Sequence, residues 1–280
     1  MPNKLRFAYN TNGCNNHRLY DALDLIAEAG YDGVALTLDW QHLDPFAENW
    51  KEQSENLKNK LDTLGLGCVI ETGARYLLDP REKHEPTFLN PKQEGRNRRL
   101  EFLKRAVDIA GILNAEAVSF WAGVKQQIVS DRDAHDYLKT GVTSLAAYAA
   151  EKNVLLALEP EPGMLIETLS DLEELNKELA IPLPLALDVG HVWVTGEMDP
   201  AHAVEKYAGT SSTAAIEGMN KGVHIHLPVT EGDMHVPKIV MAFQKQDYDK
   251  LICVELSRES HRAHRAIFES ISALREMESR

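Results

Sequence analysis

Short apolar runs alternate along the chain with longer segments in which apolar and polar residues are mixed. Eight of the short runs have the length and β-branched content of buried strands. They are LRFAYN (5–10), GVALTLD (33–39), GCVIETG (67–73), AVSFWAG (117–123), VLLALEP (154–160), LPLALDV (183–189), GVHIHLP (222–228) and LICVELS (251–257). Several of them are almost wholly apolar, as strands covered on both faces should be. The pattern predicts eight buried strands.

The segments between these runs have helical periodicity. In RLYDALDLIAEAG (18–30), apolar side chains recur on one helical face, and Gly30 stands where a helix C-terminal glycine belongs. In MDPAHAVEKYAG (198–209), Asp199 is the expected N-cap and Gly209 the expected terminator. Helices are therefore expected between the strands.

Strand and helix alternate about eight times, which predicts parallel strands joined by right-handed crossovers. Eight such units close naturally into a (β/α)8 TIM barrel, an α/β fold with helices outside the strands. The alternative is a doubly wound open sheet, which usually carries a glycine-rich phosphate turn after its first strand. Here that position reads NTNGCNNH (10–17), without a GxGxxG or Walker pattern. The barrel is the better prediction.

Composition agrees with one domain over residues 1–280, because barrels of this length fold as single units. The formal charge of −13 would repel a nucleic-acid backbone, so a small-molecule partner is expected. No apolar stretch is long enough to cross a membrane, and MPNKLRFAYN lacks a signal peptide's apolar core. The three cysteines, Cys14, Cys68 and Cys253, lack metal-type spacing and fit reduced thiols. We therefore expect a cytoplasmic protein; its oligomeric state is not predicted.

In a barrel of this kind, active-site groups lie at the carboxyl ends of the strands. The last four predicted strands end in Glu159, Asp188, His226 and Glu255, which combine the oxygen and imidazole ligands of a divalent metal site. The alternative for LALDVGHVW (185–193) is structural: an acid that closes a strand often caps the next helix, and a nearby histidine is often a satisfied polar residue.

At these residues the chain resembles the xylose-isomerase-like barrel superfamily, which contains sugar isomerases, ketose 3-epimerases and apurinic-site endonucleases. The resemblance rests on the Glu, the Asp-x-x-His, the second His of a His-x-His and the final Glu, in that order. It implies that Glu159, Asp188, His226 and Glu255 bind one divalent ion, Mn²⁺, Mg²⁺, Co²⁺ or Zn²⁺. It also implies that the two glutamates exchange a substrate proton and that His191 binds a substrate oxygen.

The chain departs from the epimerase pattern after its His-x-His. Epimerases usually place an arginine six residues after that histidine, where this chain has Gly232. Asp233 and His235 are instead spaced as in the Asp-x-His pair of the endonucleases, so they are candidates for a second metal; otherwise they cap the next helix. The endonucleases need further histidines from strands three and four, where this chain reads ETG (71–73) and WAG (121–123).

The segment 74–93 is too long for a routine connection, and loops of this length in barrels are often lids. It carries the basic residues Arg75, Arg81, Lys83 and His84. The following EGRNRR places Arg96, Arg98 and Arg99 in the first helical turn, where positive charge opposes the helix dipole. Either an anionic substrate group or surface ion pairs with the many carboxylates would offset them.

Other candidates for substrate contact lie near predicted strand ends. Glu71 is expected to touch substrate or to pair with Arg75. Three tryptophans could stack on a sugar ring or simply pack, namely Trp40, Trp121 and Trp193. Four further polar residues could reach the mouth; they are Glu161, His224 (an alternative ligand to His226), His17 and His42.

Together these features predict a divalent-metal-dependent isomerase or epimerase that acts on a sugar or sugar phosphate. Its glutamates, Glu159 and Glu255, would transfer a proton through an enediolate. Two alternatives remain open at this point: a metal-dependent hydrolase or lyase on the same site, and a barrel that binds a metabolite without turning it over.

Overall fold

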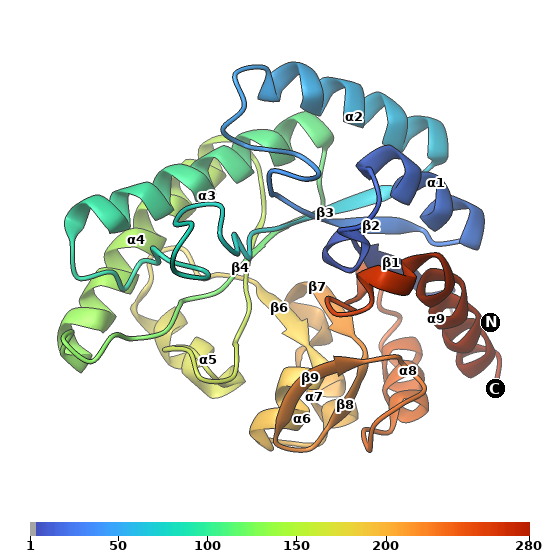
Figure 1. Ribbon diagram of the computed structural model, residues 1–280. Coiled ribbons are helices and arrows are strands. Elements are labelled where there is room, and N and C mark those ends of the chain that lie inside the picture. The colour runs from blue at the N-terminus through green and yellow to red at the C-terminus, as the bar shows by residue number, and fades with distance from the viewer. Residues whose placement is uncertain (1–3) are drawn as a thin grey trace.

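Eight parallel strands close into a barrel in the computed structural model, which describes residues 4–280 (Figure 1). The strands pair in the order β1-β10-β7-β6-β5-β4-β3-β2, and β1 also pairs with β2 to close the ring. Their bounds are β1 Arg6–Asn10, β2 Gly33–Thr37, β3 Gly67–Glu71, β4 Val118–Phe120, β5 Leu156–Leu158, β6 Leu185–Asp188, β7 Ser211–Ile216 and β10 Leu251–Val254. The predicted (β/α)8 barrel is confirmed.

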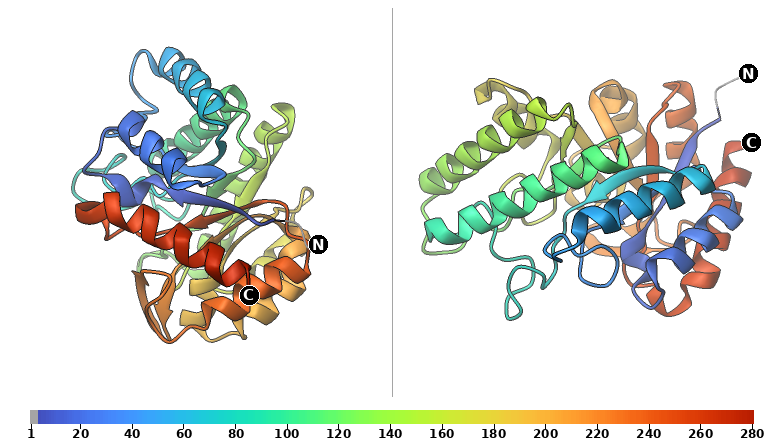
Figure 2. Two further views of the ribbon diagram at one scale, coloured as in Figure 1. Left: turned by 90° about the vertical axis from the view of Figure 1, so that its right-hand side faces the viewer. Right: turned by 90° about the horizontal axis from the view of Figure 1, so that it is seen from above.

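Helices cover the outside of this barrel (Figure 2). They are α1 Leu19–Ala29, α2 Trp50–Leu64, α3 Gln93–Leu113, α4 Asp131–Glu151, α5 Leu169–Glu178, α6 Val189–Thr195, α7 Pro200–Tyr207, α8 Val236–Lys245 and α9 Ala263–Glu278. Short 3₁₀ turns are η1 Thr11–Cys14, η2 Ala208–Thr210 and η3 Ser260–Arg262. In residues 4–280, no helix has both the length and the apolar character needed to span a membrane.

Local sequence signals place most helix ends as expected. Gly30 ends α1 in the left-handed conformation, with φ of 90°, which glycine adopts without steric cost. The side chain of Asp199 caps α7 by accepting from two backbone N–H groups. The expectation for Gly209 is wrong: α7 already ends at Tyr207, and Gly209 lies in η2 without a positive φ.

The seventh barrel strand differs from the prediction. The barrel strand is β7, whose sequence is SSTAAI, whereas the predicted run 222–228 forms β9 Val223–Leu227, which pairs antiparallel with β8 Gly218–Asn220. This β8–β9 hairpin packs against α6 (Figure 1). The small Ser, Thr and Ala side chains of β7 fit a crowded barrel interior but give a weak hydrophobic signal. The sequence of β9 has the pattern of a buried strand, but its residues are intermediate or exposed in the structure.

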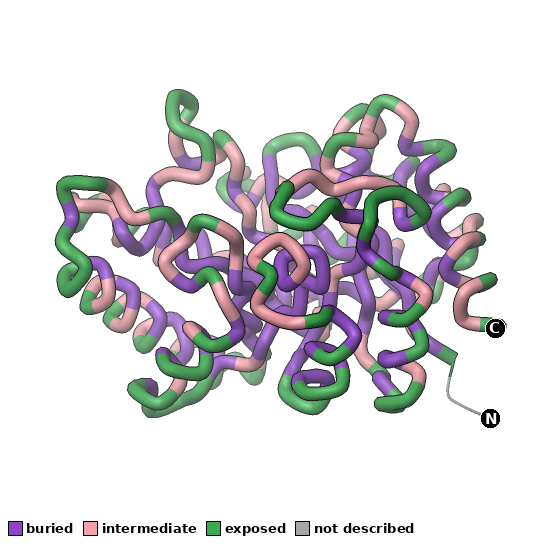
Figure 3. The backbone as a smooth tube through the Cα atoms, turned by 90° about the horizontal axis from the view of Figure 1, so that it is seen from below, coloured by how far each residue is buried: buried purple, intermediate pink, exposed green. Residues whose placement is uncertain are grey.

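The core has two layers, and the chain is buried towards the middle and exposed in the outer loops and turns (Figure 3). The larger layer, between strands and helices, holds the bulky apolar side chains. The inner layer fills the barrel with small residues, mostly alanine; its members are Ala8, Ala35, Val69, Ala117, Ala157, Ala186, Leu251 and Cys253. Small residues leave room for the larger polar side chains that follow them along the strands.

Candidate functional site

A ring of polar side chains lies directly beyond the inner apolar layer, at the carboxyl ends of the strands. Because side chains alternate along a strand, the residue two places after each layer member faces the same way. These residues are Asn10, Thr37, Glu71, Ser119, Glu159, Asp188 and Glu255, and Glu217 holds the matching place directly after β7. The barrel therefore concentrates five carboxylates at one end of its interior.

A cavity of about 500 Å³ opens at this ring, a size that fits a sugar-like molecule. Its acidic lining comes from Glu71, Glu159, Glu161 and Glu255, and its imidazoles are His84, His191, His224 and His226. Trp121 and the cationic residues Arg75, Lys83 and Arg258 complete much of the wall. The cavity thus has polar groups that can accept hydrogen bonds, donate hydrogen bonds and bind a cation.

Asp188 both caps a helix and keeps an oxygen free. Its Oδ1 accepts from the backbone N–H of His191 at 2.9 Å, which satisfies the start of α6. Its Oδ2 is buried and has no hydrogen-bond partner within residues 4–280. The structural reading of LALDVGHVW is therefore correct for one oxygen, while the other is available to a ligand.

His191 is oriented by its neighbours. Its Nδ1 lies 3.1 Å from the carbonyl oxygen of Pro160, which can only accept, so Nδ1 carries the proton. Its Nε2 lies 3.5 Å from Asp188 Oδ2 and 3.8 Å from Glu161 Oε2, without a hydrogen bond. Although burial lowers it, the pKa of His191 is raised overall, because Asp188 and Glu161 favour the charged ring.

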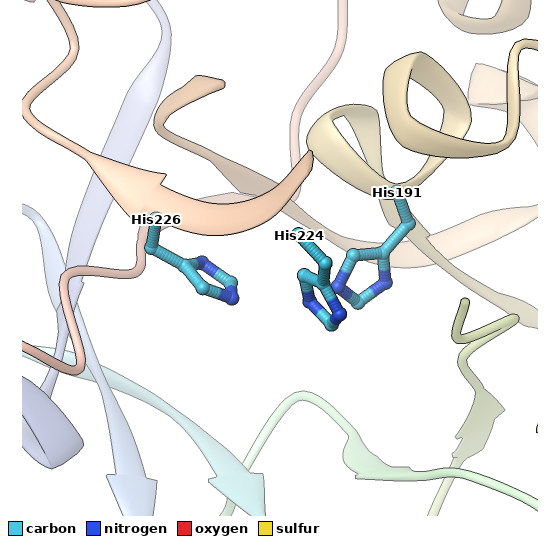
Figure 4. A group of neighbouring side chains, drawn as sticks. All are labelled: His191, His224 and His226. Atoms are coloured by element: carbon cyan, nitrogen blue, oxygen red, sulfur yellow. The ribbon is translucent and has the colours of Figure 1, made fainter. Parts of the chain in front are cut away.

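The histidines converge on one space from two elements (Figure 4). His191 comes from α6, and His224 and His226 come from β9, with the rings of His191 and His224 4.7 Å apart between centroids. One ligand atom from each of the three lies within 4.8 Å of the others. Glu159, Asp188 and His191 form a second group by the same measure, so His191 belongs to both.

The electrostatics of the ring favour a bound cation. Burial, followed by neighbouring carboxylates, raises the pKa of Glu71 and Glu159 well above the ordinary value. Burial alone would raise the pKa of Asp188, but the positive charges of His191 and His226 outweigh burial and lower this pKa below its ordinary value. Asp188 Oδ2, His191 Nε2 and His226 Nδ1 are buried without a hydrogen-bond partner in the part of the chain that the structure describes, and each imidazole nitrogen lies within 4 Å of a carboxylate oxygen. Oxygen and imidazole donors in such a setting fit a divalent ion.

The two glutamates predicted to move protons are held differently. Glu159 is buried, and its Oε2 accepts from the hydroxyl of Ser119 at 3.4 Å. Glu255 is half-buried, and its Oε1 accepts from Nδ2 of Asn12 at 2.8 Å. Glu255 belongs to neither three-residue group, yet both carboxylates line the same cavity.

Sequence reasoning missed Glu217. This side chain is 0% exposed, neither carboxylate oxygen has a hydrogen-bond partner in the described chain, and Oε2 lies 3.9 Å from His226 Nδ1. Burial and then the charge of Asp188 raise its pKa well above the ordinary value. A signal was present, because AAIE (214–217) ends in an acid as LALE (156–159) and LALD (185–188) do.

The long loop before α3 folds over the cavity. His84 Nδ1 donates to the carbonyl of Gly73 at 2.5 Å, and the backbone N–H of His84 donates to the carbonyl of Arg75 at 2.6 Å. Arg75 donates through Nη2 to the carbonyl of Asn12 at 3.2 Å and forms no ion pair with Glu71 in the described residues. Arg81 of the same loop is exposed and does not line the cavity.

The three arginines of EGRNRR have separate environments. Arg96 donates to the carbonyls of Asn90 and Pro91, and Arg98 is exposed. Arg99 is buried, with its guanidinium 4.3 Å from the ring centroid of Trp121. They do not form one cluster, and none of them lines the cavity.

Several other predicted residues lie away from the cavity lining. Trp193 donates to Asp233 Oδ1 at 2.7 Å, and His235 caps α8 by accepting from the N–H of Lys238 at 3.1 Å. Neither Asp233 nor His235 joins a three-residue metal group in residues 4–280. Trp40, His17 and His42 also lie outside the lining, and Trp40 is 72% exposed.

Solved structures of the same fold cover almost the whole chain at low identity. The IOLI protein with a bound zinc atom aligns with a TM-score of 0.78 and 17% identity over 98% of both chains. A D-allulose 3-epimerase from Methylomonas sp. in complex with D-allulose has a TM-score of 0.75 and 17% identity, over 99% of this chain and 98% of that one. The probable 3-DHS dehydratase AsbF from Bacillus anthracis has a TM-score of 0.77 and 17% identity, over 97% of this chain and 99% of that one.

These likenesses establish the fold alone, because one barrel architecture carries many different activities. No curated protein matches the chain. The family model described as xylose isomerase-like TIM barrel matches residues 23–277, which is most of the sequence. The chain therefore belongs to the xylose isomerase-like TIM barrel family.

Proposed function

We propose that the protein is a divalent-metal-dependent isomerase or epimerase that acts on a sugar or sugar phosphate. One observation carries the proposal: Glu159 and Glu255 line a single sugar-sized cavity beside the unpartnered buried atoms of Asp188 and His191. Two carboxylates and a cation site in one cavity suit proton transfer beside a carbonyl.

The proposed ligands of the ion are Glu159, Asp188, His226 and Glu255. When bound, the ion would stabilise negative charge that develops on a substrate oxygen. The free oxygen of Asp188 and the unpartnered Nδ1 of His226 support this assignment. His191, which lies within reach of Asp188 and Glu159, would hold a substrate oxygen through Nε2.

Glu159 is the proposed base that removes the substrate proton. Burial and the neighbouring carboxylates raise the pKa of Glu159, and a carboxylate of higher pKa is a stronger base than an exposed glutamate. Proton removal beside a carbonyl leaves an enediolate on the substrate. Glu255, positioned by Asn12, would return a proton at the neighbouring carbon or on the opposite face.

The cavity wall would limit the access of water to this step. Trp121 and His84 both line the cavity, and their rings meet edge to face at 5.3 Å between centroids. A 3-epimerase of the same fold, solved in complex with D-allulose, supports a sugar-like substrate. Asp233 and His235, which would favour hydrolysis, do not line the cavity, so isomerisation remains the better-supported function.

The test is deuterium incorporation. The Mn²⁺-loaded or Zn²⁺-loaded protein is incubated in deuterated water with ketoses, aldoses and their phosphates, and products are analysed by mass spectrometry and NMR. Deuterium should enter one carbon with the wild type, whereas Glu159→Gln should lose about 10²-fold or more of the rate. Glu174→Gln, at an exposed position on α5, is the matched control. Binding of these compounds without exchange would instead indicate a non-catalytic barrel.

A further inference from the structure

The lining of the cavity is divided between anionic and cationic groups. Its carboxylates belong to the strand ends and to Glu161 just beyond β5. Its cations come from two other segments: Arg75 and Lys83 from the loop before α3, and Arg258 from the segment after β10. Substrate in this cavity would therefore meet both kinds of charge.

These three cations have no acidic partner. Within residues 4–280, none of Arg75, Lys83 and Arg258 forms an ion pair, although the chain has 43 acidic and only 30 basic side chains. Several lysines of the outer helices do pair with carboxylates, whereas these three cations remain unpaired although the cavity they line also contains four glutamates. A cation that is not engaged in an ion pair can donate charge-assisted hydrogen bonds to an anionic group of a ligand.

Hydrogen bonds hold the backbone of the loop that carries Arg75 and Lys83. The two ends of the segment 73–84 are joined by the hydrogen bonds between His84 and the carbonyls of Gly73 and Arg75. Arg75 and His84 both have positive φ, at 37° and 70°, a conformation that a non-glycine residue keeps only where its surroundings enforce it. Lys83 precedes His84 directly, so its backbone is fixed by the same contacts.

We propose that Arg75, Lys83 and Arg258 bind an anionic group of the substrate, so that the substrate is a sugar phosphate or a sugar carboxylate rather than a neutral sugar. The inference rests on the proposed function for the substrate's sugar-like part, but the anion site itself does not. The negative group stays with the cations, while the hydroxyl and carbonyl groups face the carboxylates and histidines. Hydrogen bonds from these cations to an anionic group would be charge-assisted, and such bonds are stronger than hydrogen bonds between neutral groups.

Binding tests the proposal separately from turnover. Isothermal titration calorimetry on the metal-loaded full chain compares D-fructose with D-fructose 6-phosphate, and D-glucose with D-glucuronate. At least one anionic probe should bind about tenfold or more tightly than its neutral partner, with an affinity that falls as salt increases. The two pairs distinguish a phosphate from a carboxylate.

Two substitutions reduce the chance that misfolding explains the result. Lys83→Gln and Arg258→Gln change exposed side chains, and each should reduce the preference for the anion about tenfold while leaving the neutral probe unaffected. Arg81→Gln, an exposed cation of the same loop outside the lining, should leave the preference unchanged. Equal affinity for charged and neutral probes, no measurable binding of any anionic probe, or an equal effect of Arg81→Gln would overturn the proposal. Anion preference without deuterium exchange would support the anion site and contradict the isomerase.

Discussion

Oδ2 of Asp188 lies 3.5 Å from Nε2 of His191, and neither buried atom has a hydrogen-bond partner in residues 4–280. Leaving a buried polar atom unsatisfied costs about 1–3 kcal/mol, and more for charged groups. Two such atoms side by side, among several carboxylates, indicate a position that a ligand completes. Asp188 meanwhile caps α6, so one residue serves both the fold and the site.

The first prediction concerns metal content. Protein purified without added metal, or after incubation with Mn²⁺ or Zn²⁺, should contain about one equivalent by mass spectrometry. Asp188→Asn should lose it, because the free oxygen supplies a charged donor, and Asp233→Asn should retain it. At a hundredfold excess over Kd, the ion should stabilise the wild type by about 2.7 kcal/mol. A metal-free wild type, or an Asp188→Asn variant with full metal content, would contradict the site.

The second prediction concerns packing between Gly190 and Glu217. A Cβ added at position 190 would lie 1.8 Å from Glu217 Oε1. Gly190→Ala should therefore destabilise the fold by about 1–3 kcal/mol in urea unfolding. Glu217→Ala should relieve the clash, so the double variant should be more stable than the two separate losses predict. Gly209→Ala, with open space around its Cβ and no positive φ, should have little effect. Strict additivity would refute this contact.

The third prediction concerns His84 and pH. Burial lowers its pKa from 6.5 to about 4. Between these values the unfolded chain binds a proton that the folded chain does not, so the free energy of unfolding should fall as pH drops from 6.5 towards 4. The contribution is at most about 3.4 kcal/mol, at 1.36 kcal/mol per pKa unit.

His84→Asn provides the comparison, because asparagine tolerates positive φ and its amide can donate to the carbonyl of Gly73. Urea midpoints measured between pH 7 and 4.5 should fall less steeply in this variant than in the wild type. His264→Asn, at an exposed position, should follow the wild-type slope. Parallel slopes for His84→Asn and the wild type would show that folding does not lower the pKa of His84.

The fourth prediction concerns the buried Arg99. Its Nη2 donates to the carbonyl of Thr72 at 3.1 Å, its Nη1 has no partner in the described chain, and burial lowers its pKa to about 9. Arg99→Ala should leave a cavity and cost about 3–5 kcal/mol. Arg99→Met should cost clearly less, because it fills most of the volume without a buried charge.

The neighbouring Arg98 is the control for this position. Because its side chain is exposed, Arg98→Ala should change the free energy of unfolding by less than about 0.5 kcal/mol. Tryptophan fluorescence should report Arg99→Ala as well, since the guanidinium lies over Trp121. Equal losses for the alanine and methionine variants would show that the charge, rather than the volume, stabilises this site.

Most of the fold follows from sequence periodicity. Seven of the eight barrel strands coincide with predicted apolar runs, because strands buried on both faces must be apolar throughout. The exception is β7, whose Ser, Thr and Ala side chains are buried by the barrel around them rather than by their own hydrophobicity. Hydrophobicity alone does not distinguish such a strand from a loop, although AAIE (214–217) ends in an acid as LALE (156–159) and LALD (185–188) do.

The same reason explains which parts of the candidate site could be predicted. Glu159, Asp188 and Glu255 lie at the ends of strands that the sequence pattern identifies. Once the barrel was predicted, the common position of these three carboxylates could be predicted as well. His226 reaches the cavity from a hairpin, and Glu217 follows the strand that the sequence pattern concealed.

By itself the sequence determined the barrel, the strand ends that carry acids, and the helix caps at Gly30 and Asp199, since each depends on periodicity or neighbouring residues. Only the tertiary structure decided which cations reach the cavity, that the buried guanidinium of Arg99 packs against the ring of Trp121, and that the β8–β9 hairpin brings two histidines to His191. These relationships join residues far apart in the chain. They depend on how closure of the barrel brings separate loops together, which no local pattern records.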